Sequence, residues 1–194
     1  QNRSGETMQP LRLVIPGEYW DSQMYMGRLF LFHANGSLRV VDWDTLIEDW
    51  PVPAEAKLAM DCAFSRSDYF YGDQWKRLFE DDEIRTVLQR KFERLAQRQL
   101  TVEQADLERS SVLAIDSPFP FPHADTTMYM GAMYAASRSG VFMHTSDDLS
   151  QSTSRPALAE RMWDGPALAI DASLKTLAVA AGEEGLFEIS LEES

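Results

Sequence analysis

The sequence predicts a mainly β protein made of small antiparallel sheets that recur along the chain, interrupted by an α-helical insertion. The tetrapeptide MYMG occurs at residues 24–27 and again at 128–131. In each copy a second glycine, Gly36 or Gly140, follows the glycine of the motif after nine positions. Between residues 80 and 109, by contrast, apolar side chains recur at the spacing of an amphipathic helix.

The composition is that of a globular protein with a strongly acidic surface. The chain has 194 residues, of which 44% are hydrophobic and 25% charged, enough for one medium domain or two small ones. Its formal net charge of −13 repels nucleic-acid phosphates and anionic membranes, so neither is an expected partner. The single cysteine, Cys62, cannot form an internal disulfide and favours a reducing compartment. With no membrane-spanning run and no apolar leader, we expect a cytoplasmic or nuclear protein.

Both MYMG copies lead into an apolar strand, a tight turn and a second strand. The turns contain Asn35-Gly36 and Ser139-Gly140, which supply the positive φ angles that hairpins need. A second pattern, Leu-x-(Ile/Met)-(Asp/Pro), starts near residues 13, 58, 113 and 168. We interpret these positions as the starts of four repeats in a single domain over 1–194, with 80–109 as a helical insertion.

Repeated sheets of this kind bury both of their faces by stacking on one another. The segment SLRVVDWDTL at 37–46, with its Trp43-Asp44 pair, is similar to the third-strand signature of WD-repeat β-propellers. The segment 164–191 resembles a generic propeller blade with a hairpin turn at Gly185. The resemblance covers three of the four repeats. It implies a partial or four-bladed β-propeller of antiparallel sheet repeats, with first strands that line a central channel.

The second repeat, DYFYGDQWKRLF at 68–79, resembles a hemopexin-like blade with a hairpin around Gly72. Four-bladed rings of that kind are closed by a disulfide, which a single cysteine cannot form. We therefore favour an incomplete propeller, with a closed four-bladed ring and a sandwich or mixed fold as the alternatives. An incomplete propeller leaves an open sheet edge, which predicts self-association or a covering partner.

The insertion at 80–109 predicts a long helix followed by a short one. Acidic residues at its start and arginines toward its end match the helix dipole. Thr101 with Gln104 predicts a capping box for the second helix. The apolar positions that define the first helix are Ile84, Leu88, Phe92 and Leu95.

Two groups of residues are candidates for binding a protein partner. Arg90, Arg94 and Arg98 lie at helical spacing and predict a basic stripe for an acidic patch; the alternative is a solvated face paired with nearby carboxylates. Phe119 and Phe121 alternate with prolines in SPFPFPH, which predicts either an exposed contact patch or a cover for the end of a sheet.

Asp61, Asp116 and Asp171 end three copies of the Leu-x-(Ile/Met) pattern, and together they are a candidate metal site in a propeller channel. The alternative is that each aspartate caps the turn after its own strand. The histidines at 33, 123 and 144 are interpreted as packing or solvated residues rather than a zinc site or a catalytic triad.

No catalytic or phosphate-binding motif is present, and no cofactor is expected. The sequence therefore favours a non-catalytic interaction scaffold or a subunit of a larger assembly. Its partner would be a protein that is basic overall or carries an acidic patch for the insertion. The alternative function is a propeller enzyme or metal-dependent site that uses the channel aspartates.

Overall fold

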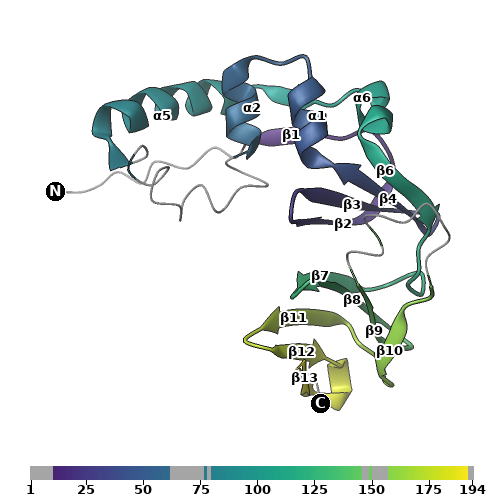
Figure 1. The fold of residues 1–194 in the computed structure, drawn as a ribbon. Helices are drawn as coiled ribbons and strands as arrows, with labels where there is room; N and C mark the ends of the chain where they lie inside the picture. Colours follow the sequence, from purple (N-terminus) through teal and green to yellow (C-terminus); the bar gives the residue numbers. More distant parts are fainter. Residues whose placement is uncertain (1–10, 62–76, 78–79, 146–148, 150–156, 192–194) are drawn as a thin grey trace. The chain divides into compact units, whose positions relative to one another are not determined.

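A computed structural model describes residues 11–61, 77, 80–145, 149 and 157–191. The described chain is mainly β, as predicted, and it divides into two compact units where the sequence predicted one domain (Figure 1). The first unit contains the described residues within 1–16 and 43–110, and the second those within 17–42 and 111–194.

The first unit is mostly helical. Its elements are β1 (Arg12–Val14), α1 (Trp43–Asp49), α2 (Ala54–Met60), α5 (Asp82–Ala96), β5 (Gln99–Thr101) and α6 (Gln104–Arg109). The two strands pair in parallel, with Leu13 opposite Leu100. The helical region predicted at 80–109 is confirmed in α5 and α6, and α1 and α2 extend the helical structure well before it.

Helix α5 begins where the sequence places a run of acidic residues. The Asp81 side chain caps the helix by accepting hydrogen bonds from the backbone N–H groups of Glu83 and Ile84, both at 3.0 Å. Near its other end, Leu95 is buried in a cluster with Ala56 and Ala59 of α2. Partly buried side chains complete this cluster: Leu11, Val52, Phe92 and Leu100.

Several local predictions for this unit are wrong. Leu58 lies in helix α2, so no repeat begins there with a strand. The predicted capping box of Thr101 and Gln104 does not form. Thr101 belongs to β5, where pairing with β1 holds it in an extended conformation. The residue that precedes α6 is Glu103, whose side chain makes no capping hydrogen bond. Trp43 begins helix α1 instead of ending a strand. The hairpin predicted around Gly72 lies outside the described residues.

The second unit contains three antiparallel sheets. The first sheet is formed by β2 (Tyr19–Tyr25), β3 (Arg28–His33), β4 (Ser37–Asp42) and β6 (Ser111–Asp116). The second is formed by β7 (Asp125–Tyr129), β8 (Ala132–Ser137), β9 (Gly140–Thr145) and β10 (Glu160–Trp163). The third is formed by β11 (Ala169–Ser173), β12 (Thr176–Ala180) and β13 (Leu186–Ser190).

The MYMG motif forms the first hairpin of a sheet. Met26 and Gly27 connect β2 to β3 with φ angles of 46° and 72°, and the turn of the second copy has angles of 49° and 75°. Two successive residues with positive φ form the tight turn whose twist matches that of the flanking strands. The third sheet has the same turn at Leu174-Lys175, which the sequence pattern does not reveal. The turns predicted at Gly36, Gly140 and Gly185 are confirmed.

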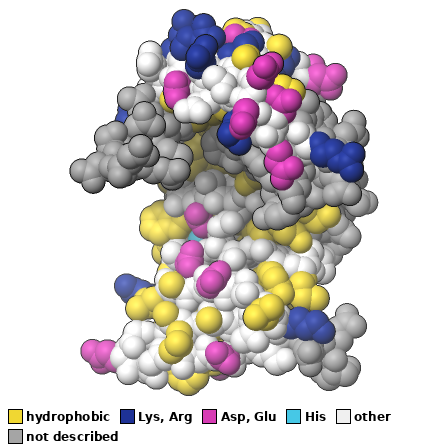
Figure 2. Space-filling view, turned by 90° about the vertical axis from the view of Figure 1, so that its left-hand side faces the viewer, with side chains coloured by type: hydrophobic (Ala, Val, Ile, Leu, Met, Phe, Trp, Pro, Cys, Tyr) yellow, Lys and Arg dark blue, Asp and Glu magenta, His cyan; other side chains and the backbone are white. Residues whose placement is uncertain are grey.

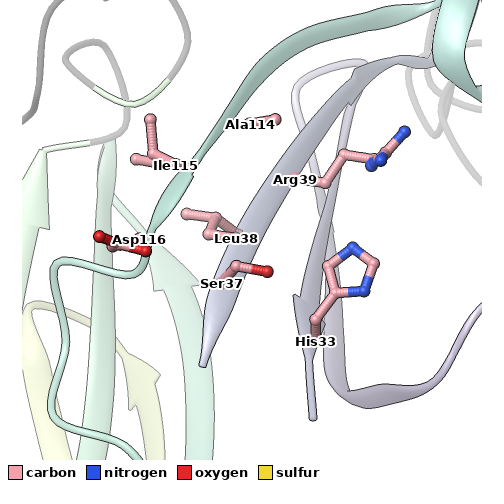
Figure 3. A pocket seen from close by; sticks show the side chains of 7 residues that line it. All are labelled: His33, Ser37, Leu38, Arg39, Ala114, Ile115 and Asp116. Atoms are coloured by element: carbon pink, nitrogen blue, oxygen red, sulfur yellow. The ribbon is translucent and has the colours of Figure 1, made fainter. Parts of the chain in front are cut away.

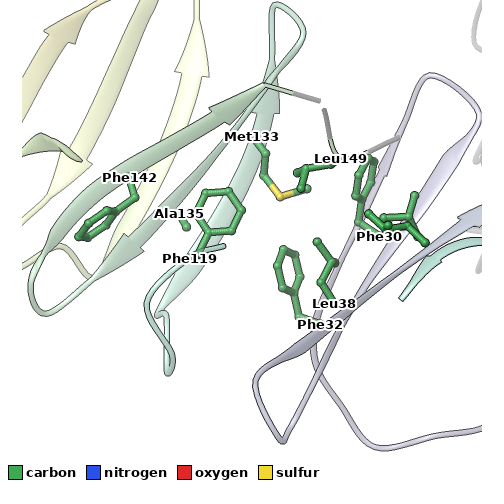
Figure 4. Close-up of a cluster of buried hydrophobic side chains, with 10 residues drawn as sticks. Phe30, Phe32, Leu38, Phe119, Met133, Ala135, Phe142 and Leu149 are labelled. Atoms are coloured by element: carbon green, nitrogen blue, oxygen red, sulfur yellow. The ribbon is translucent and has the colours of Figure 1, made fainter. Parts of the chain in front are cut away.

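The three sheets stack in chain order through two apolar layers. The layer between the first and second sheets includes Phe30, Phe32, Met133 and Phe142 (Figure 4). The layer between the second and third includes Tyr134, Val141, Ile170, Leu177 and Val179. The second sheet is therefore covered on both faces, in agreement with the predicted stacking of sheet repeats.

The repeat boundaries differ from those predicted. Leu113 lies in β6, the outer strand of the first sheet, whereas Leu168 directly precedes β11, the first strand of the third sheet. The two LAID segments are thus not equivalent, and Leu13 lies in β1, outside the three sheets. The structural repeats instead begin at β2, β7 and β11.

Candidate functional sites

The first strands of the three sheets lie next to one another, with β7 between β2 and β11. The same two kinds of polar contact join the first strand of one sheet to the next sheet, once from β2 and once from β7. The Thr126 hydroxyl donates to Oδ2 of Asp21 at 2.6 Å, and the backbone N–H of Ile170 donates to Oδ2 of Asp125 at 2.9 Å. Each aspartate therefore accepts a hydrogen bond from the first strand of the next sheet.

The second kind of contact involves the tyrosine of MYMG. The Tyr25 hydroxyl accepts from the backbone N–H of Gly131 at 2.9 Å, and the Tyr129 hydroxyl accepts from that of Lys175 at 3.0 Å. Gly131 and Lys175 occupy the same position in their turns. We call the aspartate and tyrosine contacts together the intersheet latch. In the third sheet the corresponding positions, counted back from the turn, are Ala169 and Ser173.

His123 is buried beside the first latch. Its side chain is 1% exposed, and Nε2 lies 3.8 Å from Oδ2 of Asp21. Neither ring nitrogen has a hydrogen-bond partner among the described residues. Burial lowers the pKa of His123, and the carboxylates of Asp21 and Asp125 partly counteract this effect. The imidazole is therefore neutral at neutral pH.

A polar pocket of about 370 Å³ opens on the first sheet (Figure 3). Its lining residues come from β3, β4 and β6: His33, Ser37, Leu38, Arg39, Ala114, Ile115 and Asp116. Arg39 pairs with Ala114, and Ser37 with Asp116, across the β4–β6 register. Directly paired residues point to the same face, so these polar side chains project from the face opposite the buried Leu38 and Val40.

Arg39 is the cationic side chain of this pocket, which the carboxylate of Asp116 also lines. Its Nη1 donates to Oγ of Ser111 at 3.3 Å, and Nε is buried without a partner in the described structure. Burial lowers the pKa of His33, and the Arg39 charge lowers it further. Burial raises the pKa of Tyr19, whose ring lies 4.8 Å from that of His33, while Arg39 acts in the opposite direction.

The predicted basic stripe is exposed to solvent, but only two of its arginines lie on helix α5. Arg90 and Arg94 belong to the helix, whereas Arg98 lies in the turn between α5 and β5, and all three are exposed. Within the described ranges no carboxylate pairs with them, whereas Arg85 pairs with Asp82. Dark blue side chains gather at the upper end of the space-filling view, over the unit that contains α5 (Figure 2).

The two phenylalanines of SPFPFPH have different environments. Phe119 is 4% exposed and belongs to the layer between the first and second sheets. Of the two alternatives, its role as an exposed contact residue is wrong, and the buried alternative agrees with the structure. Phe121 is 40% exposed and packs edge-on against Trp20, with ring centroids 5.5 Å apart. Trp20 is itself 51% exposed, and its indole N–H donates to the His123 carbonyl oxygen at 2.7 Å.

The three aspartates of the predicted metal site lie in elements of different kinds. Asp61 follows helix α2, Asp116 ends the outer strand β6, and Asp171 lies within the first strand β11. In the part of the chain that the structure describes, no group of three or more His, Cys, Asp or Glu side chains is placed to hold a metal ion. The prediction assumed equivalent strand ends, and the repeats are not aligned that way.

Sequence reasoning missed the latch residues and Arg39. A signal for the latch was present, because Asp21 and Asp125 each stand four residues before the MYMG tyrosine. Arg39 carried no such signal, since its lack of a carboxylate partner depends on the β4–β6 register.

Comparison with known proteins found no matching family, no similar curated protein and no similar solved structure. None of the helices in the described residues combines the length and the apolar composition that crossing a bilayer requires.

Proposed function

We propose that this chain is a non-catalytic protein–protein interaction module, a propeller-like stack of sheets that carries helix α5 as a binding element. The observation that carries the proposal is the exposed stripe of Arg90, Arg94 and Arg98 on an otherwise acidic chain. Three arginines without described ion-pair partners are available to carboxylates of another protein. The partner surface is therefore acidic.

The packing of α5 supports this role. Leu95 is buried against Ala56 and Ala59 of α2, which anchors one face of the helix. Val87, three residues before Arg90 and seven before Arg94, is 53% exposed. This exposed apolar side chain adds contact area beside the arginines. A partner whose acidic surface surrounds an apolar centre can bury it.

The arrangement of the second unit supports a propeller-like description. Its sheets stack in chain order, their first strands are neighbours, and their outer strands β6 and β10 lie at the opposite edges of their sheets. Propeller blades have this arrangement. We propose an open array of blades rather than a ring, because the three sheets of the second unit stack in a row and the described strands do not close them into a ring.

The test replaces Arg90, Arg94 and Arg98 together with glutamate. A partner captured by the parent chain and then purified should bind this variant at least about tenfold more weakly, because attraction becomes repulsion. The affinity between the partner and the parent chain should also fall as the salt concentration rises, because salt screens exposed charges. Affinity and salt dependence are measured by isothermal titration calorimetry.

The control carries the same change in charge at exposed positions elsewhere, with glutamate in place of Arg12, Arg138 and Lys175. If both triple variants lose affinity equally, net charge rather than the stripe governs binding. Unchanged affinity of the α5 variant, with an unchanged melting temperature, would contradict the proposal.

A further inference from the structure

We propose that the pocket on the first sheet binds a small anionic group, a carboxylate or a phosphate, through the guanidinium of Arg39 with His33 beside it. This site lies in the second unit, whereas the α5 stripe lies in the first. The inference is therefore independent of the proposed protein-binding function.

The first argument is the missing counter-charge of Arg39. The chain contains 31 Asp and Glu residues, yet no described carboxylate forms an ion pair with this half-buried guanidinium. Its one described hydrogen bond is the 3.3 Å contact with the neutral Ser111 hydroxyl. A partly desolvated guanidinium gains most from a bidentate anion such as carboxylate or phosphate.

The second argument is the shape and composition of the pocket. Arg39 and His33 lie on the same side in the close-up view, and the Ser37 side chain lies between the His33 ring and the β6 strand (Figure 3). The neutral imidazole supplies one N–H donor and the guanidinium several. A pocket of about 370 Å³ accommodates a small ligand or the end of a larger one.

The third argument concerns selectivity. Asp116 lines the pocket on the neighbouring strand, with Ser37 as its cross-strand partner. Its carboxylate repels a densely charged anion and favours a ligand whose anionic group is accompanied by a cationic or neutral part. Replacing Asp116 with asparagine should therefore tighten the binding of a simple anion.

The site can be tested with acetate and inorganic phosphate as probes, titrated at constant ionic strength and followed by amide NMR. We expect saturable shifts at His33, Ser37 and Arg39 with at least one probe. Saturation with acetate alone identifies a carboxylate ligand, and saturation with phosphate alone identifies a phosphate ligand. Saturation with both identifies a general anion site.

Arg39→Gln should weaken binding about tenfold, the effect of losing one charge-assisted interaction. The matched control Arg138→Gln removes an exposed arginine of the same unit and should leave binding unchanged. With acetate as the probe, acidification should tighten binding as His33 gains a proton. If Arg39→Gln perturbs the fold, Arg39→Lys serves instead. It keeps the positive charge but lacks the planar guanidinium, so it should still bind the probe, more weakly than the parent chain does. Absence of saturable shifts with both probes, or equal binding by the parent chain and a folded Arg39→Gln variant, would overturn the proposal.

Discussion

The hydroxyl oxygen of Tyr25 accepts a hydrogen bond from the backbone N–H of Gly131, 2.9 Å away in the next sheet. Tyr129 makes the same contact with Lys175, at 3.0 Å. The residue that ends the first strand of one sheet thus holds the first turn of the following sheet. This repeated relationship explains why MYMG occurs twice: the Met-Gly turn forms the hairpin, and the tyrosine before it joins two sheets.

Removing the Tyr25 hydroxyl should lower the free energy of unfolding by about 1 kcal/mol, because the N–H of Gly131 loses this partner. Tyr25→Phe keeps the ring and tests the hydrogen bond alone, with urea denaturation as the measurement. Tyr129→Phe should have an effect of similar size, and the two effects should add if the junctions are independent. Equal stability of both variants and the parent chain would show that the latch does not stabilise the stack.

His123 should make the stability depend on pH. Burial lowers its pKa, although Asp21 and Asp125 oppose that shift, so the folded chain binds this proton less readily than the unfolded chain does. The stability contributed by neutral His123 is therefore fully present above the unfolded pKa of about 6.5 and is lost as the pH falls below it. The loss amounts to at most about 1.4 kcal/mol per pH unit.

The measurement is urea denaturation about one pH unit above and one below the ordinary histidine pKa of about 6.5. His123→Gln, which cannot be protonated in this range, should flatten the dependence even if it lowers stability overall. His33→Gln serves as a comparison, because His33 also has a lowered pKa but is only partly buried. An unchanged pH dependence in the His123 variant would refute its assignment as the titrating group.

Phe119 and Phe121 should respond differently to truncation. Phe119→Ala leaves a cavity between the first and second sheets and should cost about 3–5 kcal/mol of unfolding free energy. Phe121→Ala removes a half-exposed ring and should cost about 1 kcal/mol or less. The two variants are compared by chemical denaturation. Similar losses would mean that Phe119 is less buried in solution than in the structure.

Strand β13 should promote self-association of the chain. In the described structure it pairs with β12 alone, and Leu186 at its start is 72% exposed. Unpaired backbone groups along such an edge can pair with another chain, and a lysine on the edge opposes that pairing. We expect concentration-dependent association by light scattering that Leu186→Lys weakens. Leu174→Lys, at a turn residue that is 89% exposed, is the matched control and should have no effect.

The sequence correctly predicted the elements that depend on residues close together in the chain. The hairpins at Gly36, Gly140 and Gly185 follow from turn chemistry, and helix α5 follows from its apolar spacing and the acidic residues at its start. Such elements depend on contacts within a few residues, so local pattern is sufficient to predict them.

Tertiary structure decided which strands belong to which sheet and which side chains come together. The LAID segments at 113 and 168 have the same letters, yet one forms an outer strand and the other leads into a first strand, because β4 offers a free edge to β6 after a long stretch of intervening chain. The burial of Phe119, the unpaired charge of Arg39 and the contact between Tyr25 and Gly131 all depend on side chains brought together across sheets or strands. The sequence by itself therefore determined the hairpins and the helix, whereas packing between distant segments determined the candidate sites.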